Sequence, residues 1–310
     1  MPPRTEAPPT PHITAASLVP VAVLTLVWGC NWPVLKMGVA ELAPLTFRAL
    51  TLPFAALGLL ALAKLSGDSV RIPRPLWGKL ALLALFNIAG WNGLVLFGVQ
   101  QLPAGRSVIL AFTMPIWSVL FSLVLLHEPL SKRKTAGMAL GILGLGVLLG
   151  DDIRHFERTP TAALLIVGAA LSWALGTVLL RKWKLPVPQN TLSGWMMLLG
   201  WIPMAILAPF FGPGPPHALS ASGWFAIFYN IFLAGTLAHW AWFTLARTLP
   251  VAVSSMSSLP VPIVGVFAGM LLLGERPGPS EWIALALVVA ALIAVLWAPK
   301  PAAARWAPDN

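Results

Sequence analysis

Four polar side chains interrupt long apolar stretches of this sequence: Asn31, Asn87, Asn92 and His239. An amide both donates and accepts hydrogen bonds, and a histidine can also carry a proton near neutral pH. Within a membrane, such groups are costly unless they face protein or water, so they often mark a solute pathway. They are therefore candidate solute contacts. A helix–helix hydrogen bond for each amide, and a packed histidine, remain the structural alternatives.

Asn31 has the most suggestive surroundings, because it lies between Gly29 and Pro33. Proline has no N–H, so Pro33 leaves the carbonyl of Gly29 without its usual helical donor. A bent helix with an open carbonyl next to a side-chain amide could hold a polar solute. We therefore take Asn31 as a binding candidate and Pro33 as a hinge candidate.

Tryptophan is abundant, with 15 residues in the chain. Those near the ends of apolar stretches fit the aromatic belts of membrane proteins. Those at greater depth could line a cavity that stacks planar or apolar solutes, although packing against protein or lipid is the alternative. The deep candidates are Trp28, Trp91, Trp117, Trp173 and Trp242, with Met114 as an adaptable neighbouring wall.

Hydroxyl groups and prolines come together late in the chain. Ser254 and Ser258 lie in a serine-rich run that is followed by Pro260 and Pro262, and Pro115 follows Met114 in the first half. The pattern predicts polar, bendable segments. We expect both serines to contact the solute and all three prolines to act as hinges.

Two arginines can each be interpreted in two ways. Arg48 lies about one turn into an apolar stretch, where it could anchor a substrate carboxylate. It could instead serve as an interhelical partner, for example of Glu41 or of a helix-end carbonyl, and we favour this structural role. Arg106 could attract an anion at a cavity mouth or could be a solvated charge at a helix end.

No enzyme motif or metal-binding cluster occurs in the sequence. We expect no catalytic residues, no cofactor and no metal. Ser257 or Ser258 with His239 is the only crude nucleophile–base combination, so an intramembrane enzyme is the alternative from another class. The single cysteine, Cys30, allows no disulfide within the chain.

The elements that must position these residues are long apolar helices. The chain is 58% hydrophobic and only 10% charged, so the bilayer is its natural solvent. Stretches of about 20 apolar residues can each span a membrane as a helix. The sequence predicts an all-α integral membrane protein with ten such stretches: 17–38, 44–64, 76–99, 104–126, 133–150, 161–181, 190–211, 221–246, 250–273 and 281–298.

The basic residues predict the orientation. Most of the 20 Lys and Arg residues, including those at 132–134 and 181–184, fall in loops on the same side as the amino terminus. Cytoplasmic loops are enriched in Lys and Arg, so both termini should be cytoplasmic, in a cell (inner) membrane. This distribution, without a basic aromatic stripe, argues against nucleic-acid binding.

Matching residues predict an internal repeat. Ser107 recurs as Ser254, Pro115 as Pro262 and Glu128 as Glu275, each pair 147 residues apart. Five stretches in each half would place the halves in opposite orientations, as in many transporters. The predicted organisation is a flexible tail at 1–16, a first five-helix repeat at 17–150, a second, inverted repeat at 151–298, and a tail at 299–310.

These features resemble the EamA-type branch of the drug/metabolite transporter superfamily. The resemblance rests on Trp28-Gly29-x-Asn31-Trp32-Pro33 with Lys36, Pro44 and Arg48, on Ser172-Trp173-Ala174-Leu175-Gly176, and on the apolar runs that end in Glu128 and Glu275. It implies a central cavity lined by the first, third, fourth, sixth, eighth and ninth helices, with the fifth and tenth as scaffold. The tryptophans resemble those of members that export aromatic amino acids.

We therefore predict a carrier that exports small amphipathic metabolites, above all amino acids including aromatic ones, by alternating access. The alternative within transport is a carrier of other drug-like or sugar-type metabolites, and a channel is a further possibility. The expected partners are a small-molecule substrate and the lipid bilayer, with the protein a monomer or weak homodimer. The site should be mainly aromatic and neutral, and transport should not depend on protons or sodium.

Overall fold

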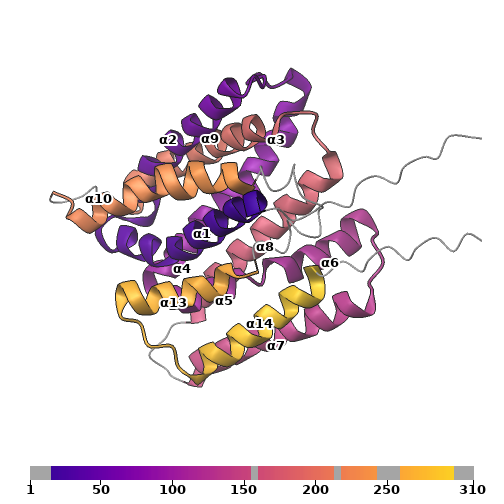
Figure 1. Cartoon of the computed structure of the whole chain (residues 1–310), viewed down its shortest axis with the longest axis vertical. Helices are drawn as coiled ribbons and strands as arrows, with labels where there is room; N and C mark the ends of the chain where they lie inside the picture. The colour runs from indigo at the N-terminus through magenta and orange to yellow at the C-terminus, as the bar shows by residue number, and fades with distance from the viewer. Residues whose placement is uncertain (1–14, 155–159, 213–217, 243–258, 297–310) are drawn as a thin grey trace, which may run out of the picture.

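The computed structural model describes residues 15–154, 160–212, 218–242 and 259–296, and these residues contain helices and no strand (Figure 1). The elements of the first half are α1 (Ala15–Glu41), α2 (Pro44–Leu65), η1 (Arg74–Leu76), α3 (Trp77–Ala84), η2 (Leu85–Gly90), α4 (Trp91–Gln101), α5 (Ala104–Ala111), α6 (Met114–Leu126) and α7 (Lys132–Arg154). Those of the second half are α8 (Pro160–Trp183), α9 (Gln189–Leu207), η3 (Ala208–Phe210), α10 (Ala221–Phe228), η4 (Tyr229–Leu237), α13 (Val261–Leu273) and α14 (Pro279–Leu296).

Nine helical segments among the described residues are long and apolar enough to cross a membrane. The helix Val261–Leu273 is apolar but shorter. Residues 243–258, which complete the expected eighth and ninth stretches, lie outside the described part of the chain. The prediction of an all-helical membrane protein is therefore confirmed, while the count of ten spans stays a prediction.

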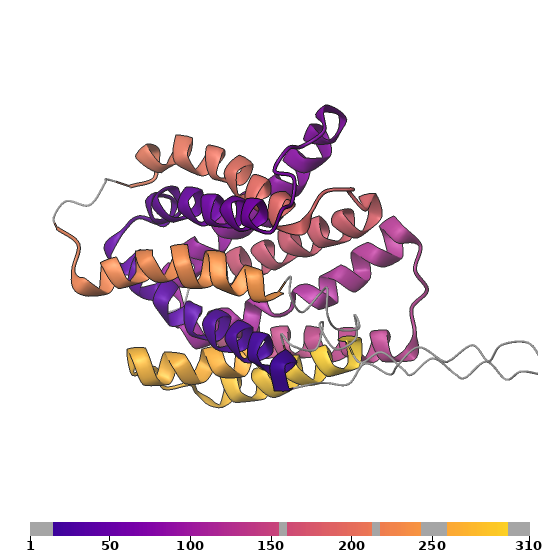
Figure 2. The same ribbon diagram turned by 45° about the horizontal axis from the view of Figure 1, so that its top comes forward.

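Helices that are distant in sequence pack side by side. Helix α14 lies along α7 at one edge of the molecule, and α2 lies along α9 at the opposite edge (Figures 1 and 2). Between these pairs, α1 packs against α13 and α4 packs against α8. Glycines allow the close approach: a Cβ added at Gly29 would lie 2.4 Å from Val264, and one at Gly98 would lie 2.3 Å from Ile166.

Two of the expected spans are interrupted helices rather than continuous ones. The stretch 76–99 contains the π-helical segment η2, and the stretch 104–126 is broken between α5 and α6. Pro115 explains the second break, because it has no N–H for the carbonyl of Ala111 and sits in the first turn of α6. Hydropathy alone does not reveal either feature, since neither changes the apolar composition.

The second half repeats these local features. A second π-helical segment, η4, follows α10, and α13 begins with Pro260 as its N-cap and Pro262 in its first turn. Helices α6 and α13 both end at a left-handed residue, His127 and Gly274. After each, a glutamate N–H bonds back six residues over 3.3 Å, from Glu128 to Ser122 and from Glu275 to Gly269.

Candidate functional site

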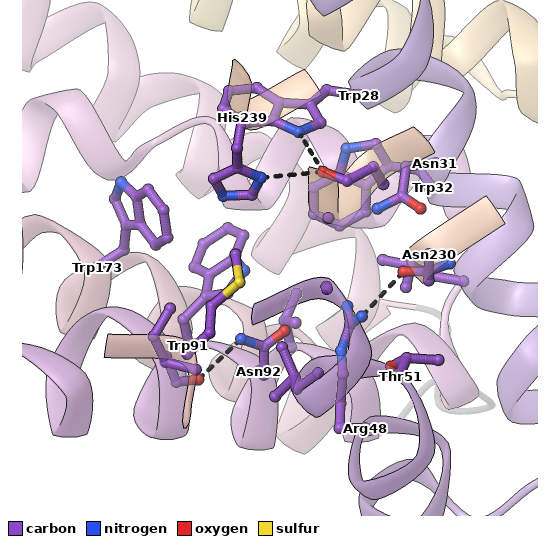
Figure 3. A pocket seen from close by; sticks show the side chains of 18 of the residues that line it. Trp28, Asn31, Trp32, Arg48, Thr51, Trp91, Asn92, Trp173, Asn230 and His239 are labelled. Atoms are coloured by element: carbon purple, nitrogen blue, oxygen red, sulfur yellow. Dashed lines mark hydrogen bonds between the residues drawn. The ribbon is translucent and has the colours of Figure 1, made fainter. Parts of the chain in front are cut away.

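Side chains from both halves of the chain surround a central cavity (Figure 3). Its first-half lining residues are Trp28, Asn31, Trp32, Leu35, Arg48, Thr51, Leu52, Ala55, Ile88, Trp91, Asn92, Val95, Phe112 and Met114. Its second-half lining residues are Trp173, Met197, Asn230, Ala234, Gly235, His239 and Val261. The six expected spans all contribute, and α2 and α9 contribute as well.

The fifth and tenth spans are absent from this lining among the described residues. Helices α7 and α14 pack on one another instead. Gly137 and Gly144 face α14, where an added Cβ would lie 2.6 Å from Val295 and 3.3 Å from Leu287, respectively. The small-residue face of α7 thus packs closely against α14.

Aromatic rings form one part of the cavity wall. The Trp91 and Trp173 rings lie with centroids 5.2 Å apart at an interplanar angle of 58°. The Trp28 and His239 rings meet edge-on, with centroids 5.4 Å apart. These surfaces offer flat, polarisable contacts to an apolar or planar group.

The π-helical segment η4 explains how His239 is held. Its Nδ1 lies 3.0 Å from the carbonyl oxygen of Ala234, and Trp28 Nε1 donates to the same oxygen over 3.3 Å (Figure 3). Because a carbonyl only accepts hydrogen bonds, Nδ1 must carry a proton. One carbonyl thus orients both rings. This carbonyl belongs to the π-helical segment η4, where the helix is locally wider than an α-helix.

The polar part of the wall centres on Arg48. Its Nη1 donates a 2.9 Å hydrogen bond to Oδ1 of Asn230 on η4, which joins the two halves. Asn92 Nδ2 donates to the carbonyl of Ile88 over 2.9 Å, which fixes its amide. The Oδ1 atom of Asn31 is buried and accepts no hydrogen bond.

These contacts correct one expectation. The suggested partnership of Arg48 with Glu41 is wrong, because the Glu41 carboxylate receives hydrogen bonds from Ser220 and Ser222 near the start of α10. The site was expected to be mainly aromatic and neutral, and Arg48 adds a charged side chain to its lining, since arginine is charged at any physiological pH. The sequence cannot show a partner that lies 182 residues away.

Both interpretations of Arg106 are also wrong. Its side chain is fully buried, and Nη1 lies 2.7 Å from Glu281 and 3.0 Å from Asp151. Arg106 therefore ties α5 to α7 and α14 inside the protein. It is neither a solvated helix-end charge nor an exposed attractor for anions.

Seven of the predicted solute contacts line the cavity: Trp28, Asn31, Trp91, Asn92, Met114, Trp173 and His239. Trp117 lies outside its lining, with Nε1 donating to Thr113 over 3.1 Å, and Trp242 packs beside Trp28. Ser254 and Ser258 lie outside the described residues. Of the hinge candidates, Pro33 lies within α1 and the other three lie at the start of α6 or α13.

Several lining residues were not singled out from the sequence. Asn230 could have been, since it is an amide within the apolar stretch 221–246. Trp32 adjoins Asn31 and, like the other deep tryptophans, lies well inside an apolar stretch. The residue types of Thr51 and Met197 did not mark them as cavity residues, because small hydroxyl and apolar residues occur throughout such helices.

Comparison with known proteins agrees with this architecture. The family model of the EamA-like transporter family matches residues 16–150 and again residues 160–297. A chain of a solved crystal structure shares the fold, with a TM-score of 0.64 and 21% sequence identity, covering 91% of this chain and 97% of that one.

Two curated relatives cover most of both chains. An Escherichia coli (strain K12) protein named as the uncharacterized inner membrane transporter YedA is 29% identical over 274 residues, or 88% of each chain. An E. coli protein named as a probable amino-acid metabolite efflux pump is 24% identical over 284 residues, 87% of this chain and 91% of its own.

The apolar helices are those of a multi-pass membrane protein, and a cavity lined by both halves is the arrangement typical of transporters. The repeated family match is more specific: this chain belongs to the EamA-like transporter family. A family of transporters also argues against the enzyme alternative.

Proposed function

We propose that this protein is a carrier that exports small amphipathic metabolites, with amino acids, including aromatic ones, as its main substrates. The observation that carries the proposal is the cavity that both halves line with tryptophans, amides and one arginine. Such a lining can hold a solute that has an apolar group and a polar group at once. A relative named as a probable amino-acid metabolite efflux pump supports this substrate class.

The proposed mechanism is alternating access between two inverted five-helix repeats in the inner membrane, with both termini in the cytoplasm. The matching helix starts support it, because Pro115 and Pro262 occupy corresponding places in the first turns of α6 and α13. Rocking about these two segments would expose the cavity to one side and then to the other. The working unit is a monomer or weak homodimer, and nucleic acid has no part in it.

Counterflow in proteoliposomes tests this function. Vesicles loaded with an unlabelled amino acid should take up the labelled form transiently above its equilibrium level, because a carrier exchanges solutes through one site. The panel comprises aromatic and aliphatic amino acids, polyamines, nucleosides and sugars. Exchange of a sugar or nucleoside alone would favour the alternative carrier, and no saturable exchange of any solute would refute the proposal.

A further inference from the structure

We propose that Arg48 binds the carboxylate of the transported solute, so that the cavity selects zwitterionic or anionic solutes over their decarboxylated analogues. The inference deepens the proposed function and rests on it. It assigns the polar end of the cavity to a specific chemical group.

The charge of Arg48 has no counter-charge within the described protein. The residue is only 7% exposed and lies in the cavity lining. Among the described residues, Arg106 pairs with Asp151 and Glu281, Lys134 and Arg181 pair with Glu128, and Arg48 takes part in none of these ion pairs. A buried guanidinium cannot lose its proton, so a neighbouring anion would stabilise it strongly.

The geometry leaves Arg48 able to accept such an anion. Its Nη1 bonds to the neutral Oδ1 of Asn230 at 2.9 Å, while its Nε is buried and has no hydrogen-bond partner. Guanidinium groups bind carboxylates through pairs of parallel N–H donors, which gives both strength and orientation. A carboxylate that reaches the guanidinium from the cavity would supply the acceptor that Nε lacks.

The rest of the cavity suits the other groups of an amino acid. Asn31 contributes a buried Oδ1 that accepts no hydrogen bond, so it could receive an N–H of a solute ammonium. Figure 3 shows Arg48 and Asn230 on one side of the cavity and Trp91 and Trp173 on the other. A solute whose carboxylate reaches Arg48 would thus direct its apolar side chain toward the two indoles.

The test compares matched pairs of acid and amine on the full-length protein: tryptophan with tryptamine, phenylalanine with phenethylamine, and leucine with isoamylamine. Binding is read from thermal stabilisation of the purified protein, and transport from counterflow. The acids should bind and exchange, and each amine should be weaker by roughly tenfold to a hundredfold, the range expected for a hydrogen bond to a charged group.

Two variants act on the cavity charge in different ways. Arg48→Gln removes it and should abolish the preference for acids. Asn230→Asp keeps Arg48 but supplies a carboxylate within hydrogen-bond reach, so it should weaken acid binding by a similar factor even if Arg48→Gln folds poorly. Lys64→Gln removes an exposed charge from the last turn of the same helix and serves as the matched control, with no change expected.

The inference is overturned if the amines bind as well as the acids, if none of the three acids binds, or if folded Arg48→Gln or Asn230→Asp protein keeps the preference for acids. The proposed carrier function fails by a different result, namely the absence of counterflow for every acid, amine and sugar. Exchange of amines or sugars without acids would therefore refute the role of Arg48 and leave a carrier.

Discussion

The carboxylate of Glu275 accepts a hydrogen bond of 2.6 Å from the backbone N–H of Ala104, the first residue of α5. The adjacent N–H of Gly105 donates to the same carboxylate over 2.9 Å. A side chain of the second half thus satisfies the open donors at the start of a helix in the first half. The negative charge also faces the positive end of that helix.

Substituting Glu275 should therefore weaken the contact between the second half and the start of α5 in the first half. Glu275→Ala removes both acceptors and leaves two backbone N–H groups unpaired, which should cost roughly 2 kcal/mol. Glu275→Gln keeps one acceptor oxygen and should lose less. Thermal unfolding of the purified protein measures both. An unchanged melting temperature for Glu275→Ala would show that this contact does not hold the halves together.

Helix α7 offers a matched pair of glycines for testing the packing of α7 on α14. Gly137 is buried, and an added Cβ would lie 3.0 Å from the carbonyl of Ala291, whereas one at Gly146 meets nothing within 4 Å. We expect Gly137→Leu to destabilise the protein by about 1–3 kcal/mol through overpacking. Gly146→Leu should be nearly neutral. Equal melting temperatures for the two variants would contradict the observed interface.

Cysteine labelling tests the proposed topology. After Cys30 is replaced by serine, a cysteine at Ala218, between α9 and α10, should react with an impermeant reagent from outside the cell. A cysteine at Lys132, at the start of α7, should react only after the membrane is permeabilised. Both positions are exposed in the structure. The reverse labelling pattern would refute the orientation and the inverted repeat together.

The sequence predicted the helices well because each one is a long apolar run, and the bilayer leaves few alternatives for such a run. Pro115 marked the region of the break between α5 and α6, but nothing in the sequence indicated the π-helical segments η2 and η4. A π-helical turn changes the hydrogen-bond spacing without changing the composition, so the hydropathy of the sequence cannot predict it. These irregular segments also contribute Ile88, Phe112 and Asn230 to the cavity lining.

The site was predicted only in part, because depth along a helix does not determine which way a side chain points. Trp173 and Trp117 are both deep in their spans, yet only Trp173 lines the cavity. The rotation of each helix is set by packing against others, and Trp117 turns toward Thr113 instead. The partner of Arg48 was missed for a related reason, since contacts between halves have no local signal.

We expect transport to proceed without a proton or sodium gradient. No carboxylate lines the cavity among the described residues, and Nδ1 of His239 already contacts the carbonyl of Ala234. Proton relays usually need buried acidic or histidine groups in series. Proteoliposomes without a pH or sodium gradient should therefore show downhill uptake and exchange. Uphill accumulation driven by a pH gradient, and lost in His239→Ala, would instead identify His239 as a coupling residue.

The central claim is that solutes cross through the cavity between the halves. Trp173→Ala and Trp117→Ala remove the same side chain at the cavity wall and outside it, respectively. Loss of aromatic contact costs about 0.5–1.5 kcal/mol beyond the lost area.

Amino-acid counterflow by the wild type and these two variants, at matched levels of folded protein, is the most direct measurement. We expect the half-saturation concentration to rise by about tenfold in Trp173→Ala, as such a loss would give, and to stay nearly unchanged in Trp117→Ala. An unchanged value in Trp173→Ala, or a larger defect in Trp117→Ala, would contradict it.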